Sequence, residues 1–190
     1  ALKSGDDDII CFGHPDTQVK FFYKKYCEFI YSKIKDNFKN KDLKKLTLLE
    51  LGCGRGTASI FLEKKLNIKV IGVDFSDESI KIAKKNANKY NSNAIFIKGD
   101  IFEPKKILED SNLELKKFDI VISLGVLEHI ENIDDCFKIH FNLMNQDGLF
   151  LAMIVPEKNS IQEFFAPLNR VLMKINSREK KEGNLKHLDK

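Results

Sequence analysis

The feature that most constrains the fold is a run of alternating glycines, Gly52, Gly54 and Gly56, which directly follows the apolar segment 46–51. Apolar residues then recur at helical spacing as far as Leu66. Glycines between a strand and a helix remove side chains where backbone approaches a ligand, and a helix N-terminus favours anions. We therefore expect a site for an anionic or nucleotide-like ligand at the carboxyl edge of an open α/β sheet.

Strand and helix patterns alternate after this loop, which is typical of βαβ units and a parallel sheet. Short apolar runs predict further strands at 68–73, 94–98, 118–124 and 149–155. One helix is predicted after the capping residue Ser76, which acidic residues follow. A second helix is predicted from an apolar stripe made of Ile133, Phe137, Phe141 and Met144.

Two helical segments flank this alternating region. Residues 17–38 are predicted to form a long amphipathic helix, and residues 160–175 repeat the pattern. We expect a helical cap over 1–45, a ligand-binding core over 46–155, and a helical insertion with the C-terminal part of the same domain over 156–190. The stripe of the first helix comprises Val19, Phe22, Tyr23, Tyr26, Phe29, Ile30, Ile34 and Phe38.

Composition narrows the class of protein. A chain of 190 residues that is 43% hydrophobic and 32% charged is typical of one folded domain, which excludes disordered and fibrous classes. No apolar run approaches the ~20 residues that span a bilayer, and from the polar start we expect no signal peptide. The net charge of +4 favours no particular partner. Four cysteines without metal-ligand spacing predict reduced thiols in a cytoplasmic protein and no metal site.

An acidic residue ends the second predicted strand. Asp74 lies 22 residues beyond Gly52, where a carboxylate can accept hydrogen bonds from both ribose hydroxyls. The dinucleotide pattern G-x-G-x-x-G would need a small residue where Thr57 stands. The spacing E-x-G-x-G-x-G therefore predicts a nucleoside ligand and departs from the dinucleotide pattern.

Segment 50–56 resembles motif I of the class I S-adenosylmethionine-dependent methyltransferases. Segments 73–76, 99–101 and 118–130 resemble later motifs of that family in the same order. The resemblance covers about residues 46–155 and implies a Rossmann-like, doubly wound, mostly parallel sheet with helices on both faces. Against the family's seven strands, the sequence predicts five and lacks the last two. The fifth strand would then be an exposed edge unless another element covers it. A partner chain, a second copy, a swapped segment or simple truncation of the sequence would each account for this edge.

The same resemblance implies a binding site for S-adenosylmethionine. It places the methionine part of the cofactor against Gly52, Gly54 and Gly56, its ammonium group near Glu50, and its ribose on Asp74. The remaining implied contacts are to adenine from Phe75, Asp100 and Ile101, and to the ammonium group from backbone carbonyls of Leu124 and Gly125. Carboxylates suit the hydroxyl, amino and ammonium donors of such a ligand, and a helix N-terminus suits its carboxylate.

Histidine is the first candidate for a general base, because its pKa lies near neutrality. His129 follows the fourth predicted strand, within a Glu-His-Ile sequence that resembles that of methyltransferases acting on small molecules. The predicted activity is methyl transfer to an oxygen, nitrogen or carbon of a small-molecule acceptor. Glu128 and His129 are alternatively the start of the next helix, and His140 is interpreted as a structural residue of that helix.

Three other functions stay open. A nicotinamide-dependent oxidoreductase is suggested by a Y-x-x-x-K spacing at Tyr31 and Lys35, although it precedes the glycine loop, the wrong order for that chemistry. A non-catalytic module that binds the cofactor or a partner would explain the missing strands. RNA is a further candidate acceptor because the N-terminal helix is rich in lysine, whereas the Asn-Pro-Pro-aromatic segment of DNA amino-methyltransferases is absent.

Overall fold

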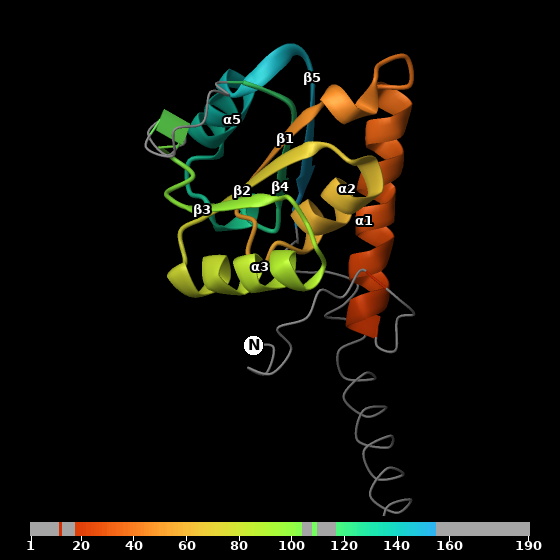
Figure 1. Cartoon of the computed structure of the whole chain (residues 1–190). Helices are drawn as coiled ribbons and strands as arrows, with labels where there is room; N and C mark the ends of the chain where they lie inside the picture. The colour runs from red at the N-terminus through yellow and green to blue at the C-terminus, as the bar shows by residue number, and fades with distance from the viewer. Residues whose placement is uncertain (1–11, 13–17, 104–107, 110–116, 155–190) are drawn as a thin grey trace, which may run out of the picture. The chain divides into compact units, whose positions relative to one another are not determined.

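The computed structural model describes residues 12, 18–103, 108–109 and 117–154. The chain divides into two units, 1–154 and 155–190, and every described residue belongs to the first. That unit contains a five-stranded parallel sheet in the order β3-β2-β1-β4-β5 (Figure 1). The strands are β1 (Thr47–Leu51), β2 (Lys69–Asp74), β3 (Ile95–Lys98), β4 (Phe118–Leu124) and β5 (Met144–Met153).

The strand order confirms the predicted doubly wound α/β fold. From the central strand β1 the chain moves outward through β2 to β3, and β4 then returns to the other side of β1. Leu49 of β1 is level with Ile71 of β2 and with Val121 of β4. The order therefore reverses between β1 and β4, which is where open α/β sheets bind ligands.

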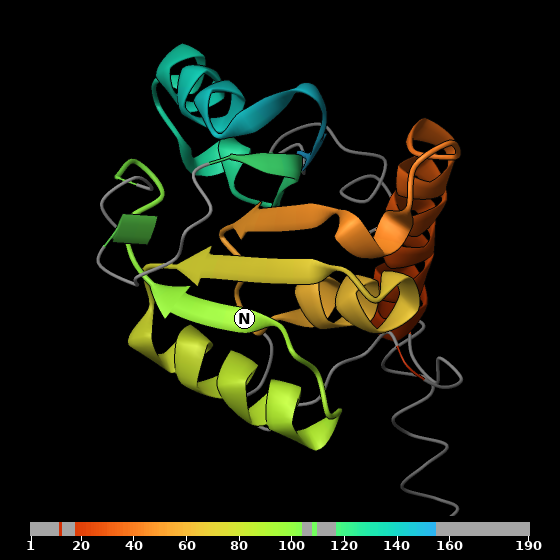
Figure 2. The same cartoon turned by 45° about the horizontal axis from the view of Figure 1, so that its top comes forward.

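Helices cover both faces of the sheet (Figure 2). One face packs against α1 (Gln18–Asn37), α2 (Thr57–Leu66) and α3 (Asp77–Lys89), and the other packs against α5 (Ile133–Asn142). Alternate strand residues divide between the two faces, as the pleat requires. The first face includes Leu48, Val70, Ile120 and Ile122, and the second includes Leu49, Leu51, Ile71, Val73 and Val121.

The helices predicted within the described residues are present, but α1 does not bury the whole predicted stripe. Cys27, Ile30 and Ile34 are buried, whereas Phe22 and Phe29 are 61% and 57% exposed. Only one side of a helix can face a single neighbouring layer. The stripe was too wide for that side, so its outer phenylalanines reach solvent.

The start of β5 differs from the prediction. Met144, expected on a helix, pairs with Phe118 of β4, and the next pair joins Leu149 to Ile120. The register therefore shifts, with extra residues on the β5 side. Gly148 lies in this irregular segment, where an added Cβ would stand 2.9 Å from the carbonyl oxygen of Asn145 and 3.1 Å from that of Asp119. Such close backbone approach requires glycine.

Helix α5 also buries a different face from the predicted one. Cys136, His140 and Leu143 are buried, whereas Ile133 and Phe141 are exposed. Nδ1 of His140 donates to the carbonyl of Cys136 at 2.7 Å, and Nε2 is buried with no hydrogen-bond partner among the described residues. Burial lowers the pKa of His140, and the carbonyl of Cys136 partly opposes this. The placement confirms that His140 belongs to the helix packing.

No described helix is long and apolar enough to cross a membrane. The helical pattern predicted over 160–175 and the remainder of 156–190 lie outside the described residues.

Candidate functional site

The predicted site residues converge at one edge of the sheet. Because the strands are parallel, the segments that follow their carboxyl ends lie along the same edge, and the arrowheads of β1, β2 and β3 point the same way in Figure 2. The segments gathered there are Gly52–Gly56 after β1, Asp74–Phe75 at β2, Asp100–Ile101 after β3 and Leu124–Gly125 at β4.

The glycine loop is tied to β2 by its backbone. The N–H groups of Gly52 and Cys53 both donate to the carbonyl of Val73, at 2.8 and 2.9 Å. The N–H of Gly54 donates to Oδ2 of Asp74 at 2.8 Å. The sequence suggested that backbone N–H groups of this loop bind an anion. Three of them, from Gly52, Cys53 and Gly54, instead bond to β2 and hold the loop against that strand.

The glycines serve two different purposes. Gly52 has a φ of 79°, and an added Cβ there would lie 2.2 Å from Cγ2 of Val126. Gly54 has a φ of 50°, and an added Cβ would meet no described atom within 4 Å. The missing side chain at Gly52 makes room for the protein itself, whereas Gly54 borders open space where a ligand can approach the backbone.

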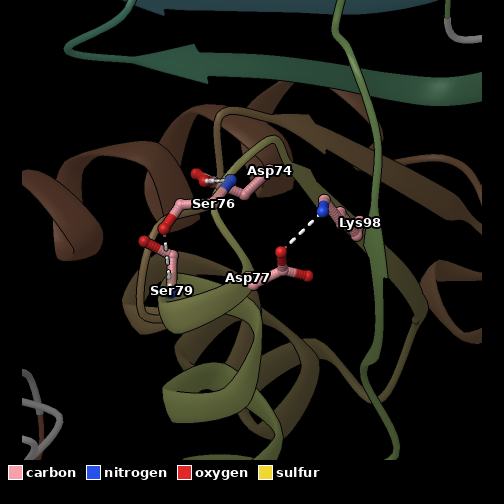
Figure 3. Close-up of polar contacts among 5 residues, drawn as sticks. All are labelled: Asp74, Ser76, Asp77, Ser79 and Lys98. Atoms are coloured by element: carbon pink, nitrogen blue, oxygen red, sulfur yellow. Dashed lines mark hydrogen bonds and ion pairs between the residues drawn. The ribbon is translucent and has the colours of Figure 1, made fainter.

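Asp74 is buried at the end of β2, and its carboxylate has a fixed orientation. Oδ1 accepts from the N–H of Ser76 at 2.9 Å, shown in Figure 3, and Oδ2 accepts from the N–H of Gly54. A carboxylate offers about four lone-pair sites, so each oxygen can accept a further bond. The two adjacent hydroxyls of a ribose could each donate a hydrogen bond to this pair of acceptors.

Polar contacts next to Asp74 join β3 to α3 (Figure 3). The hydroxyl of Ser76 accepts from the N–H of Ser79 and caps α3, as predicted from the sequence. Nζ of Lys98 lies 2.6 Å from Oδ2 of Asp77, and this hydrogen-bonded pair lowers the pKa of the Asp77 carboxyl. Lys98 is the register partner of Asp74, so a lysine lies on the strand next to this carboxylate.

Glu50 lies below the glycine loop on the face of the sheet that α2 covers. Its Oε2 accepts from the Ser59 hydroxyl at 2.5 Å, and both side chains are buried. Burial raises the pKa of Glu50 to about 7, and the charge of Asp74 adds to the increase while the Ser59 bonds oppose it. Glu50 can therefore change protonation state near neutral pH, and a nearby ligand cation would favour its ionised form.

The segment after β3 forms a turn with aromatic neighbours. Oδ1 of Asp100 accepts from the N–H of Phe102 at 2.9 Å, which leaves the exposed carboxylate a second oxygen for a ligand amino group. Ile101 is half-buried against the sheet. Phe75 is 78% exposed and Phe102 is 46% exposed. Sequence reasoning missed Phe102, although an aromatic residue directly after the predicted adenine turn was a usable signal.

The end of β4 brings a further acidic side chain to this edge. Gly125 has a φ of 71°, and its N–H donates to the carbonyl of Met153 at 2.9 Å. The short 3₁₀ helix η2 (Leu127–His129) follows, and an added Cβ on Gly125 would lie 3.8 Å from Oε1 of Glu128. Glu128 therefore turns back toward the end of β4, whereas His129 is exposed. The sequence analysis singled out the histidine as a candidate base and not the glutamate.

Other titratable groups lie elsewhere or outside the described residues. No three His, Cys, Asp or Glu side chains of the described segments are grouped to hold a metal ion. Burial raises the pKa of Cys53 well above its usual value, with the charges of Glu50 and Asp74 adding to the effect, which keeps the thiol protonated. His14 and His187 fall outside the described segments.

The chain is similar in sequence to known proteins. Residues 42–184 match a family model described as a methyltransferase domain. The ubiquinone biosynthesis O-methyltransferase of Pelagibacter ubique is 32% identical over 142 residues, which cover 74% of this chain and 55% of that protein. The release factor glutamine methyltransferase of Flavobacterium psychrophilum is 33% identical over 129 residues, covering 67% and 41%. The chain thus spans about half the length of these relatives.

Solved structures show the same architecture. The PH0226 protein from Pyrococcus horikoshii OT3 superposes with a TM-score of 0.61 at 26% identity, covering 85% of this chain and 64% of that one. The plantazolicin methyltransferase BpumL, solved in complex with S-adenosylhomocysteine (SAH), gives a TM-score of 0.55 at 22% identity, covering 71% and 48%. The second likeness concerns the fold alone.

Proposed function

The chain belongs to the class I S-adenosylmethionine-dependent methyltransferases, and from this premise we propose that it transfers a methyl group to an oxygen, nitrogen or carbon of a small-molecule acceptor. The cofactor site in this proposal is the carboxyl edge of the sheet between β1 and β4. The chain spans only part of its relatives, so the activity of the whole protein is inferred from the site that these residues form.

The observation that carries the proposal is the paired geometry of Asp74 and Gly54. Asp74 holds a carboxylate whose oxygens are both oriented by backbone N–H groups. Gly54, which supplies one of those groups, borders open space. An oriented carboxylate beside an accessible glycine backbone suits a ligand with a ribose next to a compact polar group.

We assign the remaining cofactor contacts by position along this edge. Asp100, Ile101 and Phe75 would hold adenine, and Phe102 would add a second aromatic surface beside it. The glycine loop and the backbone at Leu124 and Gly125 would hold the methionine part. Glu50, below the loop, would favour a cationic amino group there when it is ionised.

S-adenosylmethionine supplies an electrophilic methyl group when bound, so the protein must chiefly position the acceptor and exclude water. We propose that His129 accepts the proton that a hydroxyl or ammonium acceptor loses. Glu128, turned toward Gly125, would orient the acceptor from the same loop. An imidazole suits this role because histidine is the side chain that most often serves as a general base.

The proposal favours a small molecule over a nucleic acid. The ubiquinone biosynthesis O-methyltransferase of Pelagibacter ubique is named for the synthesis of a small molecule. The sequence after β4 is Gly-Val-Leu-Glu-His, whereas DNA amino-methyltransferases carry Asn-Pro-Pro-aromatic at this place. RNA as an acceptor would instead show an affinity that falls steeply with salt concentration.

The proposal extends to location and assembly. We infer a cytoplasmic protein because Cys53 and Cys136 form no disulfide within the described segments. Strand β5 pairs only with β4 in the described part of the chain, and we propose that a second copy covers its open edge. Sedimentation velocity should then show a dimer, and a monomer at every concentration would contradict this assembly.

Calorimetric titrations with SAH and with NAD test the cofactor assignment. We expect SAH to bind and to raise the melting temperature, because a ligand of the folded state stabilises it by mass action. NAD should do neither. Binding of NAD without binding of SAH would overturn the proposal in favour of an oxidoreductase.

Transfer of a labelled methyl group from S-adenosylmethionine tests the activity. Phenols, amines, carboxylates and carbon acids should be offered as acceptors, and at least one class should become labelled. Tight SAH binding without transfer to any class would favour the non-catalytic module.

A further inference from the structure

A buried polar side chain in α3 contacts the glycine loop. Asn86 is 1% exposed, and its Nδ2 donates to the backbone carbonyl of Arg55 at 3.1 Å. A buried amide is costly unless it is hydrogen-bonded. This one is bonded to a loop 31 positions earlier in the chain, so it joins α3 directly to the loop after β1.

Two hydrogen bonds hold the peptide unit between Arg55 and Gly56, one from Asn86 and one within the loop. The peptide unit between Arg55 and Gly56 presents its carbonyl to Asn86. Its N–H belongs to Gly56 and donates to the carbonyl of Cys53 at 2.9 Å. Because a peptide unit is planar, two bonds at opposite sides determine its orientation.

Packing around Gly56 brings α3 and β3 close to the same peptide. Gly56 has a φ of 77° and is the residue that precedes α2. An added Cβ on it would lie 2.6 Å from Cζ of Phe96 and 3.2 Å from Cβ of Ala83. Ala83 and Asn86 stand on one side of α3, three residues apart. The loop therefore rests on a surface of α3 in which Asn86 supplies the hydrogen bond.

Asp74 and Asn86 hold the loop at two successive points. Asp74 accepts from the N–H of Gly54, and Asn86 donates to the carbonyl of Arg55. The peptide unit between Gly54 and Arg55 lies between these two anchors. It is also the part of the loop that borders open space.

We propose that Asn86 is a positioning residue for the cofactor, which sets the orientation of the Gly54–Gly56 backbone before the cofactor binds. This inference rests on the proposed function, because it assumes that the loop holds the methionine part of S-adenosylmethionine. Asn86 reaches the ligand through the loop and makes no contact of its own. A loop ordered in advance loses less conformational entropy on binding, so removing the anchor weakens affinity.

The test compares Asn86→Ala with two control variants of the full chain. Asn88→Ala alters an exposed asparagine of the same helix. Ser92→Ala removes a 2.7 Å hydrogen bond to Glu63 and so lowers stability away from the loop. Each variant is measured for SAH affinity by calorimetry, for urea stability, and for amide hydrogen exchange over residues 52–58 without ligand.

We expect Asn86→Ala to weaken SAH binding by about tenfold, because the loop must then be ordered when SAH binds. Exchange over 52–58 should become faster, and the KM for S-adenosylmethionine should rise while kcat at saturation stays within about twofold of the original value. Both controls should bind SAH as the original chain does, although Ser92→Ala loses stability. An unchanged affinity with unchanged loop exchange in Asn86→Ala would overturn the proposal.

Asn86→Leu provides the second variant if alanine prevents folding, because leucine has the branched shape of asparagine, although it is larger, and cannot form the hydrogen bond. Faster loop exchange in Asn86→Leu supports the anchor, and unchanged exchange contradicts it. The exchange measurement needs no ligand. Failure of the original chain to bind SAH would refute the proposed function, and loop exchange would still decide whether Asn86 holds the loop.

Discussion

The carboxylate of Asp74 accepts a hydrogen bond from the backbone of Gly54, with 2.8 Å between Oδ2 and the amide nitrogen. This bond joins the end of β2 to the loop after β1. Asp74, to which we assign the ribose, is therefore directly joined to the glycine loop. A change at either residue should alter both the shape of the loop and its affinity for a nucleoside ligand.

Replacing Asp74 by asparagine should weaken SAH binding by about 10- to 100-fold, because charge-assisted bonds to two hydroxyls are lost. An amide group would also oppose the N–H of either Gly54 or Ser76, and the free energy of unfolding should fall by about 1–3 kcal/mol. Calorimetry and urea unfolding measure the two effects. Asp77→Asn is the matched control, because this exposed carboxylate bonds to Lys98 beside the site. Equal affinities for the two variants would contradict the assignment of Asp74.

Alanine at Gly52 should mainly lower stability, whereas alanine at Gly54 should mainly lower SAH affinity. At Gly52 the left-handed backbone and the contact with Val126 both oppose a Cβ, so Gly52→Ala should lose about 2–4 kcal/mol of unfolding free energy. At Gly54 only the left-handed backbone opposes a Cβ, so Gly54→Ala should lose about 1–2 kcal/mol of unfolding free energy. Its methyl group would enter the open space and reduce SAH affinity.

A double variant separates these causes. Gly52→Ala combined with Val126→Ala should recover part of the lost stability, because the clash involves the Val126 side chain. Strict additivity of the two single changes would show that the contact is not the cause.

Glu50 should make stability depend on pH in a defined direction. Its pKa rises from 4.5 to about 7 on folding, so the folded state binds more protons between these values and stability falls as pH increases through them. The contribution is fully present below about pH 4.5 and is lost above about pH 7, a difference of about 3 kcal/mol. Glu50→Gln keeps an acceptor for Ser59 and should remove this fall.

Urea unfolding of the original chain and of Glu50→Gln across this pH range measures the difference. The variant should be more stable at neutral pH and above, yet bind SAH more weakly there because it lacks the negative charge. Parallel stability curves for the two proteins would show that Glu50 does not titrate in this range.

His129→Ala tests the proposed base. Loss of a general base typically lowers turnover by about 10²–10⁴-fold. SAH affinity should stay within about twofold, because His129 is exposed on η2 and is assigned to the acceptor side. Single-turnover methyl transfer and calorimetry separate the two effects. Unchanged turnover would leave His129 with a structural role and move attention to Glu128.

Local patterns predicted most of the elements. Strand β4 begins and ends where its apolar run does, and Ser76 caps α3 as its position before acidic residues indicated. The errors arose where a local pattern was ambiguous. Met144 continued a helical spacing, yet it pairs with Phe118, because the sheet offered an unpaired strand edge. The stripe of α1 gave no sign of which phenylalanines would be buried, because that depends on the single layer it packs against.

The sequence by itself determined the order of strands and helices, the glycine loop, and the acidic residues at the strand ends, because period, capping and turn chemistry are local properties. Only the tertiary structure decided how these pieces act together. It directed Asn86 into the loop, turned Glu128 rather than His129 toward the end of β4, and buried Glu50 against Ser59. These outcomes depend on contacts between residues far apart in the chain, and no local pattern records which side chains such contacts will bury.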